Sequence, residues 1–359
     1  MIDIQVFHRA DRVNDTILQR FPPAPLAAGP NVSYVDRVTW TGRVLRDYVL
    51  PELKPDVVVN WLTEPDHTQH ARGPGSAEAR AAINADDREI GLLLDRLREL
   101  DLADKTNILI VSDHGFAHSD FGVDVTDELI KAGLKAGMDS DDVVIASSGE
   151  ALLLHVRDHD AGRIGAIVRF LQQQPWVGVL FTAAKAGAAT EGREHGTFAL
   201  DLIHLAQSDR APDIVMTFPW SSARGPGGLP GTSHTLARAT GPLAGTRANH
   251  GNMSPWTVRN TFIAWGVDFK RGITLRTPAG NVDLAPTLLA LMNLDRDVDL
   301  ARFDGRALRE AFAGGADEEQ IPVDTRTYTV ATADGAYRAA LQLTDFGRFR
   351  YVDKSWRMK

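Results

Sequence analysis

The first third of the chain alternates between apolar runs and a helical pattern. The β-branched run Asp56–Leu62 predicts a buried strand, and Asn107–Val111 predicts a second one. Between them Ser76 can cap a helix that runs to about Leu100. Because a right-handed crossover makes the strands of such a βαβ unit parallel, we expect the loops after Leu62 and Val111 at one edge of a sheet. The apolar positions at helical spacing are Ile83, Ile90, Leu93, Leu94, Leu97 and Leu100.

Similar patterns continue through the rest of the chain, and together they predict an α/β fold. The segment Ser221–Gly251 is rich in Gly, Pro, Ser and Thr and is predicted to be a long surface loop. The alternating, aromatic-bearing segment Thr327–Trp356 predicts a short antiparallel structure. The remaining predicted elements are strands at Ala151–Val156, Asp213–Thr217 and Thr261–Trp265 and helices at Ile164–Gln173 and Val282–Leu294.

Composition narrows the range of functions. The chain has 359 residues, of which 43% are hydrophobic and 24% charged, and can therefore bury a sizeable core. Its net charge of −8 argues against duplex nucleic acid as a partner. It contains no Cys, so any metal must be held by His and carboxylate groups. No stretch approaches the roughly 20 apolar residues of a membrane span, and the first residues lack the pattern of a signal peptide.

Two Asp/His pairs are the candidate chemistry. Asp66 and His70 are four residues apart in the polar loop after the first predicted strand, and Asp113 and His114 directly follow the second. A carboxylate and an imidazole can converge on one divalent cation. Each pair alone could be a solvated pair or a polar strand end. Both pairs at one sheet edge favour a metal site.

Other polar residues have weaker claims to the site. His250 follows the predicted long loop and precedes a strand, so it could reach the same edge. His67 and His118 flank the pairs and are left out of the ligand set, because histidines beside a site commonly support it or are solvated. Arg72 and Asn252 could touch a phosphate, although surface polar roles fit them as well.

These motifs together closely resemble the type I phosphodiesterase and nucleotide pyrophosphatase family of the alkaline phosphatase superfamily. The resemblance covers roughly residues 40–310. Its motifs are Glu64-Pro65-Asp66 with His70 and Gly73-Pro74, then Ser112-Asp113-His114-Gly115, then His250-Gly251, and finally Asp283-Leu284-Ala285-Pro286-Thr287. The resemblance implies a mixed, mostly parallel central sheet flanked by helices, without its N-terminal strand. It implies a hydrolase domain over residues 1–312 and a short β-rich appendix over residues 313–359.

The resemblance also implies the ligands and the reaction. Asp66, His70 and His250 would hold one divalent cation, and Asp113 and His114 would belong to a second, incomplete site, with zinc as the expected metal in both. The substrate would be a small phosphodiester or pyrophosphate, with nucleotides among the candidates.

The family's Thr or Ser nucleophile is not identified in this sequence. Asp3, Asp11, Asp15, Thr16, Thr39 and Thr41 precede Asp56, and none follows a buried strand. We expect the family's segment to lie upstream of the given start, or else the chain to be a variant that binds metal without the covalent step. The alternatives are a metal- or phosphate-binding remnant and a sulfatase or phosphonoacetate hydrolase of the same superfamily.

Overall fold

The structure, a computed structural model, describes residues 10–25, 34–206, 209–236, 247–318 and 321–358. The chain divides into two compact units, Met1–Thr106 and Asn107–Lys359. The described parts contain both helices and sheets, which confirms the predicted α/β class. No described helix is both long enough and apolar enough to span a membrane.

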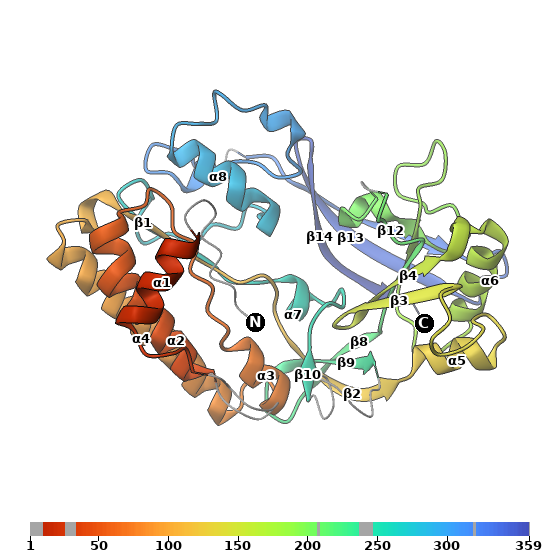
Figure 1. The fold of residues 1–359 in the computed structure, drawn as a ribbon. Coiled ribbons are helices and arrows are strands. Elements are labelled where there is room, and N and C mark those ends of the chain that lie inside the picture. The colour runs from red at the N-terminus through yellow and green to blue at the C-terminus, as the bar shows by residue number, and fades with distance from the viewer. Residues whose placement is uncertain (1–9, 26–33, 207–208, 237–246, 319–320, 359) are drawn as a thin grey trace. The chain divides into compact units, whose positions relative to one another are not determined.

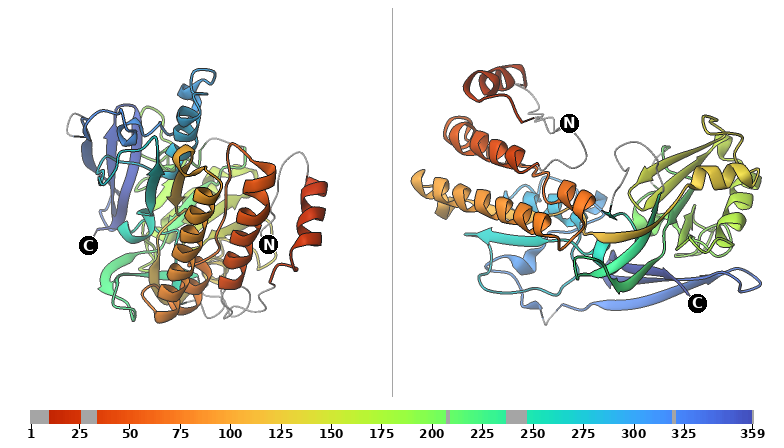
Figure 2. Two further views of the ribbon diagram at one scale, coloured as in Figure 1. Left: turned by 90° about the vertical axis from the view of Figure 1, so that its left-hand side faces the viewer. Right: turned by 90° about the horizontal axis from the view of Figure 1, so that it is seen from below.

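The described part of the first unit is helical (Figure 1). Two buried residues of α1, Val13 and Ile17, pack with Val44 and Tyr48 in a small apolar core. Figure 2 shows α1, α2 and α4 side by side. The main helices are α1 (Ala10–Arg20), α2 (Val35–Val44), α3 (Asp66–Arg72) and α4 (Ala77–Glu99), and a π-helical segment, Leu45–Leu53, continues α2.

The long helix α4 begins where the sequence predicts. The Ser76 hydroxyl oxygen accepts a hydrogen bond from the Ala79 backbone N–H at 3.1 Å and so caps the helix. Its buried face differs from the predicted one, because Ile83 is 48% exposed. The buried helix positions are Ala79, Ala82, Ala85, Glu89 and Leu97. Small residues allow α2 and α4 to pack closely. An added Cβ at Gly42 of α2 would overlap the carboxylate of Glu89 on α4.

The predicted strand Asp56–Leu62 is wrong. The structure assigns no strand there, and Val59 and Trp61 are 81% and 57% exposed. A β-branched run becomes a strand only when a neighbouring strand takes up its backbone hydrogen bonds. The described residues of the first unit form helices and no strand, so this run has no partner within its own unit. The predicted βαβ unit is therefore wrong as well.

The described residues of the second unit form four sheets. A five-stranded sheet has the order β3-β4-β7-β5-β6, a four-stranded sheet has the order β10-β2-β9-β8, and β12-β13-β14 and β1-β11 form the other two. Parallel pairing among the described strands is limited to β2 with β9 and β5 with β6. The strands are β1 (Asn107–Val111), β2 (Ala117–Val123), β3 (Val143–Ser148), β4 (Ala151–Val156), β5 (Leu180–Thr182), β6 (Phe198–Ala199), β7 (Ile214–Thr217), β8 (Trp220–Arg224), β9 (Pro230–Leu236), β10 (Ala248–Asn249), β11 (Phe262–Gly266), β12 (Asp324–Ala331), β13 (Arg338–Phe346) and β14 (Phe349–Arg357).

One apolar core joins most of the second unit. Leu154 of β4, Leu171 of α6 and Leu341 of β13 are all fully buried in the same cluster. The strands after residue 313, which the sequence predicts to form an appendix, thus share the core of the unit. The helices of this unit are α5 (Val125–Lys131), α6 (Ala161–Gln172), α7 (Pro255–Val258) and α8 (Leu284–Leu291). The domain boundary between residues 312 and 313 stays a prediction.

Most predicted strands and helices of the second unit are present, and the long loop is the exception. Within Ser221–Gly251, β8 and β9 form an antiparallel pair, and β10 pairs with β2. These strands have a polar, Gly- and Ser-rich composition that does not predict strands. They are stabilised by pairing with neighbouring strands rather than by burial of alternating apolar side chains. Part of the predicted loop, residues 237–246, lies outside the described residues.

Candidate functional site

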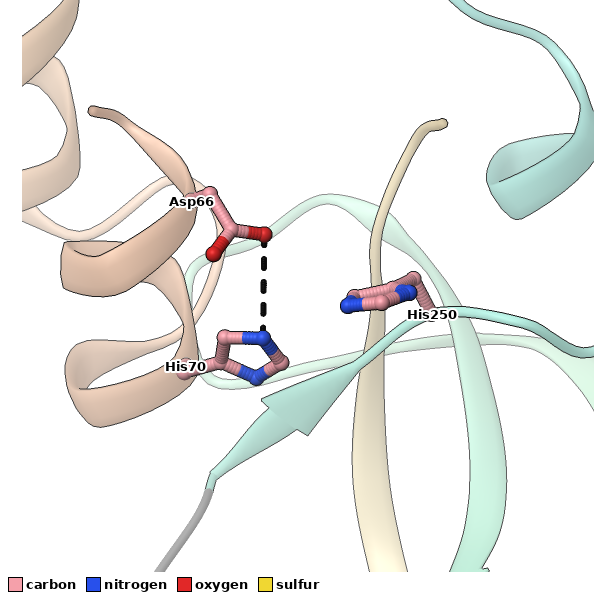
Figure 3. Close-up of side chains that lie close together, drawn as sticks. All are labelled: Asp66, His70 and His250. Atoms are coloured by element: carbon pink, nitrogen blue, oxygen red, sulfur yellow. Dashed lines mark ion pairs between the residues drawn. The ribbon is translucent and has the colours of Figure 1, made fainter. Parts of the chain in front are cut away.

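The first Asp/His pair lies on the short helix α3. Asp66 and His70 are one helical turn apart, and Asp66 Oδ1 lies 3.6 Å from His70 Nε2. Figure 3 shows the two side chains pointing toward one another from the same helix. Their side chains are 46% and 21% exposed, respectively, so both keep access to solvent. The pair is therefore a contact within one helix.

A buried carboxylate fixes the start of α3. Glu64 is 3% exposed, and its Oε1 accepts hydrogen bonds from the Tyr34 backbone N–H at 2.7 Å and the Thr68 hydroxyl at 2.8 Å. Its Oε2 accepts a third from the Thr68 backbone N–H at 3.1 Å. Glu64 thus satisfies an amide of the first helical turn, which has no partner within the helix. This contact orients the turn that carries Asp66.

The second pair follows β1 directly. Asp113 Oδ2 lies 3.5 Å from His114 Nε2, with the carboxylate half exposed. His114 Nδ1 lies 3.1 Å from the Gly115 carbonyl oxygen. Because a carbonyl only accepts, Nδ1 is the donor in this contact, and Nε2 is the ring nitrogen that faces the Asp113 carboxylate.

Two side-chain amides hold this turn in place. Asn260 Nδ2 donates to the Ser112 carbonyl at 2.6 Å, and Asn281 Nδ2 donates to the Asp113 carbonyl at 2.8 Å. The two amides also bond to each other, through Asn260 Nδ2 and Asn281 Oδ1 at 2.7 Å. A Cβ at Gly115 would overlap the Trp256 carbonyl oxygen, so glycine permits the close approach of the turn to α7.

His250 lies against His114. The two rings stack with centroids 3.5 Å apart and planes 11° from parallel. Phe116 contacts both edge-on, at 5.5 Å from the His114 centroid and 5.3 Å from the His250 centroid. The second unit therefore brings together three of the predicted site residues: Asp113, His114 and His250.

Next to His250 is a buried carboxyl group that sequence analysis missed. Glu150 is fully buried in the turn between β3 and β4. Burial raises the pKa of Glu150 to about 8, although hydrogen bonds from Ser233, Ser119 and Asn252 oppose the rise. Asn252, predicted to be able to touch a phosphate, is 3% exposed and bonded to this carboxyl.

The other polar residues singled out from the sequence have structural surroundings of their own. Arg72 is exposed on α3. His67 packs edge-on against Tyr34, with centroids 3.9 Å apart. His118 is 4% exposed in β2, and its ring lies so close to Gly225 that a Cβ there would overlap it.

The residues considered as nucleophiles differ in how far the structure describes them. Asp3 lies outside the described residues. Asp11, Asp15 and Thr16 are on α1, and Thr39 and Thr41 are on α2. Thr41 donates its hydroxyl to the Arg37 carbonyl at 2.8 Å, a bond within its own helix.

Each Asp/His pair has the dimensions of a pair of metal ligands. Zinc bonds to carboxylate oxygen and imidazole nitrogen of about 2.0–2.2 Å, in tetrahedral geometry, place the two ligand atoms about 3.3–3.6 Å apart. The observed separations of 3.6 Å and 3.5 Å lie in this range. The donor atoms are all oxygen and nitrogen, and both pairs are partly exposed. The residues present thus fit a divalent cation.

Comparisons with known proteins identify relatives. Venom phosphodiesterase 2 of Crotalus adamanteus is 35% identical over 86 residues, which are 24% of this chain and 10% of that protein. Ectonucleotide pyrophosphatase/phosphodiesterase family member 7 of Mus musculus is 37% identical over 86 residues, 23% of this chain and 19% of that protein. The matched segments thus span less than a fifth of each of these two curated relatives.

Solved structures and a family model were also compared. Murine ectonucleotide pyrophosphatase/phosphodiesterase 5 superposes with a TM-score of 0.42 at 17% identity, over 75% of this chain and 61% of that one. A family model described as type I phosphodiesterase / nucleotide pyrophosphatase matches residues 7–224, more than half of the chain. The chain belongs to the type I phosphodiesterase/nucleotide pyrophosphatase family.

Proposed function

We propose that the chain is a metal-dependent hydrolase of phosphodiester or pyrophosphate bonds. Membership of the family supports the reaction class. The observation that carries the proposal is the second pair, in which Asp113 Oδ2 lies 3.5 Å from His114 Nε2, a separation at which both atoms can bind one cation. The proposed substrate is a small phosphoester, with a nucleotide as the class that the family's description suggests.

The proposed ligand assignment follows the family resemblance. By that resemblance, Asp66, His70 and His250 are assigned to one divalent cation. Asp113 and His114 are assigned to a second cation, and zinc is the proposed metal for both. The stacking of His250 on His114 supports two neighbouring sites, because ligands of cations a few Å apart are themselves in contact.

The protein's own groups define what the site can do. Bound divalent cations would supply positive charge for the phosphoryl oxygens and make a nucleophile more acidic. The carboxylates of Asp66 and Asp113 are partly exposed and can exchange solvent for a cation without unfolding. The contact of His114 Nδ1 with the Gly115 carbonyl oxygen holds the ring orientation with Nε2 on the side of the Asp113 carboxylate.

The first test is hydrolysis of bis-p-nitrophenyl phosphate by the full chain, with zinc supplied and then removed by a chelator. We expect turnover that depends on zinc. Zinc content is measured in parallel for Asp113→Ala and His70→Ala, and each is expected to lose bound metal because a carboxylate or imidazole ligand is gone.

A matched control is available in the second unit. His204 Nδ1 and Asp304 Oδ2 lie 3.6 Å apart, at nearly the separation of the proposed ligand pairs, but neither belongs to the proposed site. His204→Ala should therefore keep the zinc content of the parent chain. Equal zinc content in His70→Ala, Asp113→Ala and His204→Ala would refute the ligand assignment. Zinc uptake without turnover would instead support the non-catalytic, metal-binding alternative.

A further inference from the structure

The fully buried carboxyl of Glu150 is surrounded by donors from three separate segments. Ser119 of β2 donates its hydroxyl to Oε1 at 2.9 Å, and the Ser233 hydroxyl of β9 lies 2.7 Å from both carboxyl oxygens. The Asn252 side-chain amide donates to Oε2. Burying a carboxyl is costly unless such hydrogen bonds compensate. Glu150 is thus the centre of a polar network that ties two strands of the second unit to the segment after His250.

The backbone around Glu150 contacts His250 directly. The Glu150 backbone N–H donates to the His250 carbonyl at 2.6 Å. Gly149 and Gly251 both have positive φ, 62° and 93°. An added Cβ at Gly149 would overlap the His250 carbonyl oxygen, and one at Gly251 would overlap the Ser148 carbonyl oxygen. The turn before β4 and the His250 segment therefore pack backbone to backbone, with no room for side chains between them.

Asn252 holds the other side of the His250 segment. Its Oδ1 accepts hydrogen bonds from the Ser254 backbone N–H at 2.7 Å and from the Thr257 hydroxyl at 2.8 Å. Its amide nitrogen donates to Glu150. The side chain therefore links the carboxyl to the start of α7, and the two residues that follow His250 are fixed by Glu150 on one side and by α7 on the other.

We propose that Glu150 is a positioning residue that holds the His250 imidazole in the stacked orientation against His114. This inference deepens the proposed function and rests on it for the role of His250 as a metal ligand. Glu150 does not touch a substrate or a cation in this proposal. It acts through the backbone of His250 and through Asn252.

The carboxyl's shape and acceptor atoms matter for this role. Glu150→Ala removes the acceptors of Ser119, Ser233 and Asn252 and leaves a cavity. The His250 segment then loses the contact made through Asn252 and keeps only the backbone hydrogen bond to its carbonyl. Glu150→Gln keeps the shape and one acceptor oxygen for Asn252. We expect zinc affinity to fall about 10–100-fold in Glu150→Ala, as when a partner behind a metal ligand is removed, and to be largely rescued in Glu150→Gln.

The experiment combines two measurements on the full-length chain. Competition with a chromophoric chelator gives the zinc dissociation constant, and NMR of the histidine-labelled, zinc-free chain reports the stacking of His114 on His250 through ring-current shifts. Tyr337→Phe is the matched control, because it removes a buried hydrogen bond to the Gly178 carbonyl, 2.8 Å long, without touching the network. Ser233→Ala is a milder second variant, in case Glu150→Ala fails to fold.

The outcomes separate the inference from the proposed function. Loss of the ring-current shifts in Glu150→Ala and Ser233→Ala, with retention in Glu150→Gln and Tyr337→Phe, supports positioning. Unchanged shifts and unchanged zinc affinity in a folded Glu150→Ala overturn it, and where Glu150→Ala does not fold, the same result for Ser233→Ala overturns it. If the parent chain shows the shifts but takes up no zinc, the metal-dependent function fails, while the NMR comparison still decides the structural role of Glu150.

Discussion

The pH dependence of stability in the first unit gives a direct test of its buried charges. Asp86 lies on α4, and burial, followed by repulsion from Glu64 and Glu89, raises its pKa from 3.8 to about 7. Within the described part of the chain, the buried oxygen Oδ1 of Asp86 has no hydrogen-bond partner. The difference in pKa corresponds to at most about 4 kcal/mol. Partial exposure to water reduces this to about 2 kcal/mol.

The sign follows from proton binding. Below about pH 4 Asp86 is protonated in both states, and its contribution to stability is fully present. Between about pH 4 and 7 only the folded state holds the proton, so the free energy of unfolding falls as the pH rises. Above pH 7 Asp86 is ionised in both the folded and the unfolded state, and its contribution to the free energy of unfolding is lost completely. Asp86→Asn cannot ionise, so the variant should be more stable than the parent by about 2 kcal/mol at pH 8 and nearly equal to it at pH 4.

Urea unfolding at several pH values measures this difference, and hydrogen exchange of α4 peptides assigns it to the first unit. Asp87→Asn is the matched control, since Asp87 is an exposed neighbour on the same helix and the substitution removes the same charge. A gain for Asp86→Asn that does not change with pH would refute the reasoning, as would an equal gain for Asp87→Asn.

Two further predictions concern the supports of the site. Gly149→Ala should lower the free energy of unfolding by about 1–3 kcal/mol and weaken zinc binding, because the new Cβ meets the His250 carbonyl. The control is Gly187→Ala, at a similar positive φ with open space around it, which should lower stability but leave zinc affinity unchanged. Chelator competition on both variants separates the two effects. Glu64→Ala should lower zinc affinity about tenfold, because it releases the first turn of α3. Glu78→Ala, in the first turn of α4, should leave zinc affinity unchanged. Equal zinc affinities of the two variants would refute the role of Glu64.

The sequence was sufficient for the elements that local pattern determines. The Ser76 cap depends on residues within one helical turn and is present as expected. Asp66 and His70 are predicted in a polar loop and lie instead on the helix α3, one turn apart. The strand predicted at Asp56–Leu62 failed because a strand depends on a partner, which no local pattern supplies. The strands within Ser221–Gly251 escaped detection for the converse reason, since neighbouring backbone stabilises a polar segment.

The supports of the candidate site could not be read from the sequence. Asn281 bonds to the Asp113 carbonyl across 168 positions, and Asn252 bonds to Glu150 across 102. Neither amide lies in a motif that distinguishes it from a surface residue. Buried polar groups of this kind depend on the tertiary structure, because only the folded chain brings together the hydrogen-bond partners that offset the cost of burial.

These supports add an observation that the separation of an Asp/His pair does not give. His204 and Asp304 lie 3.6 Å apart, at the same separation as Asp66 and His70, so distance alone does not identify a metal ligand pair. Glu64, buried and bonded to the backbone at two points, anchors the turn that carries Asp66. The amide of Asn281 does the same for Asp113. A side chain that must keep its orientation when a cation arrives needs such anchoring, because reorganising it would consume part of the binding free energy. The amides and buried carboxyls behind the proposed ligands therefore support the candidate site in a way that the Asp–His separations alone do not.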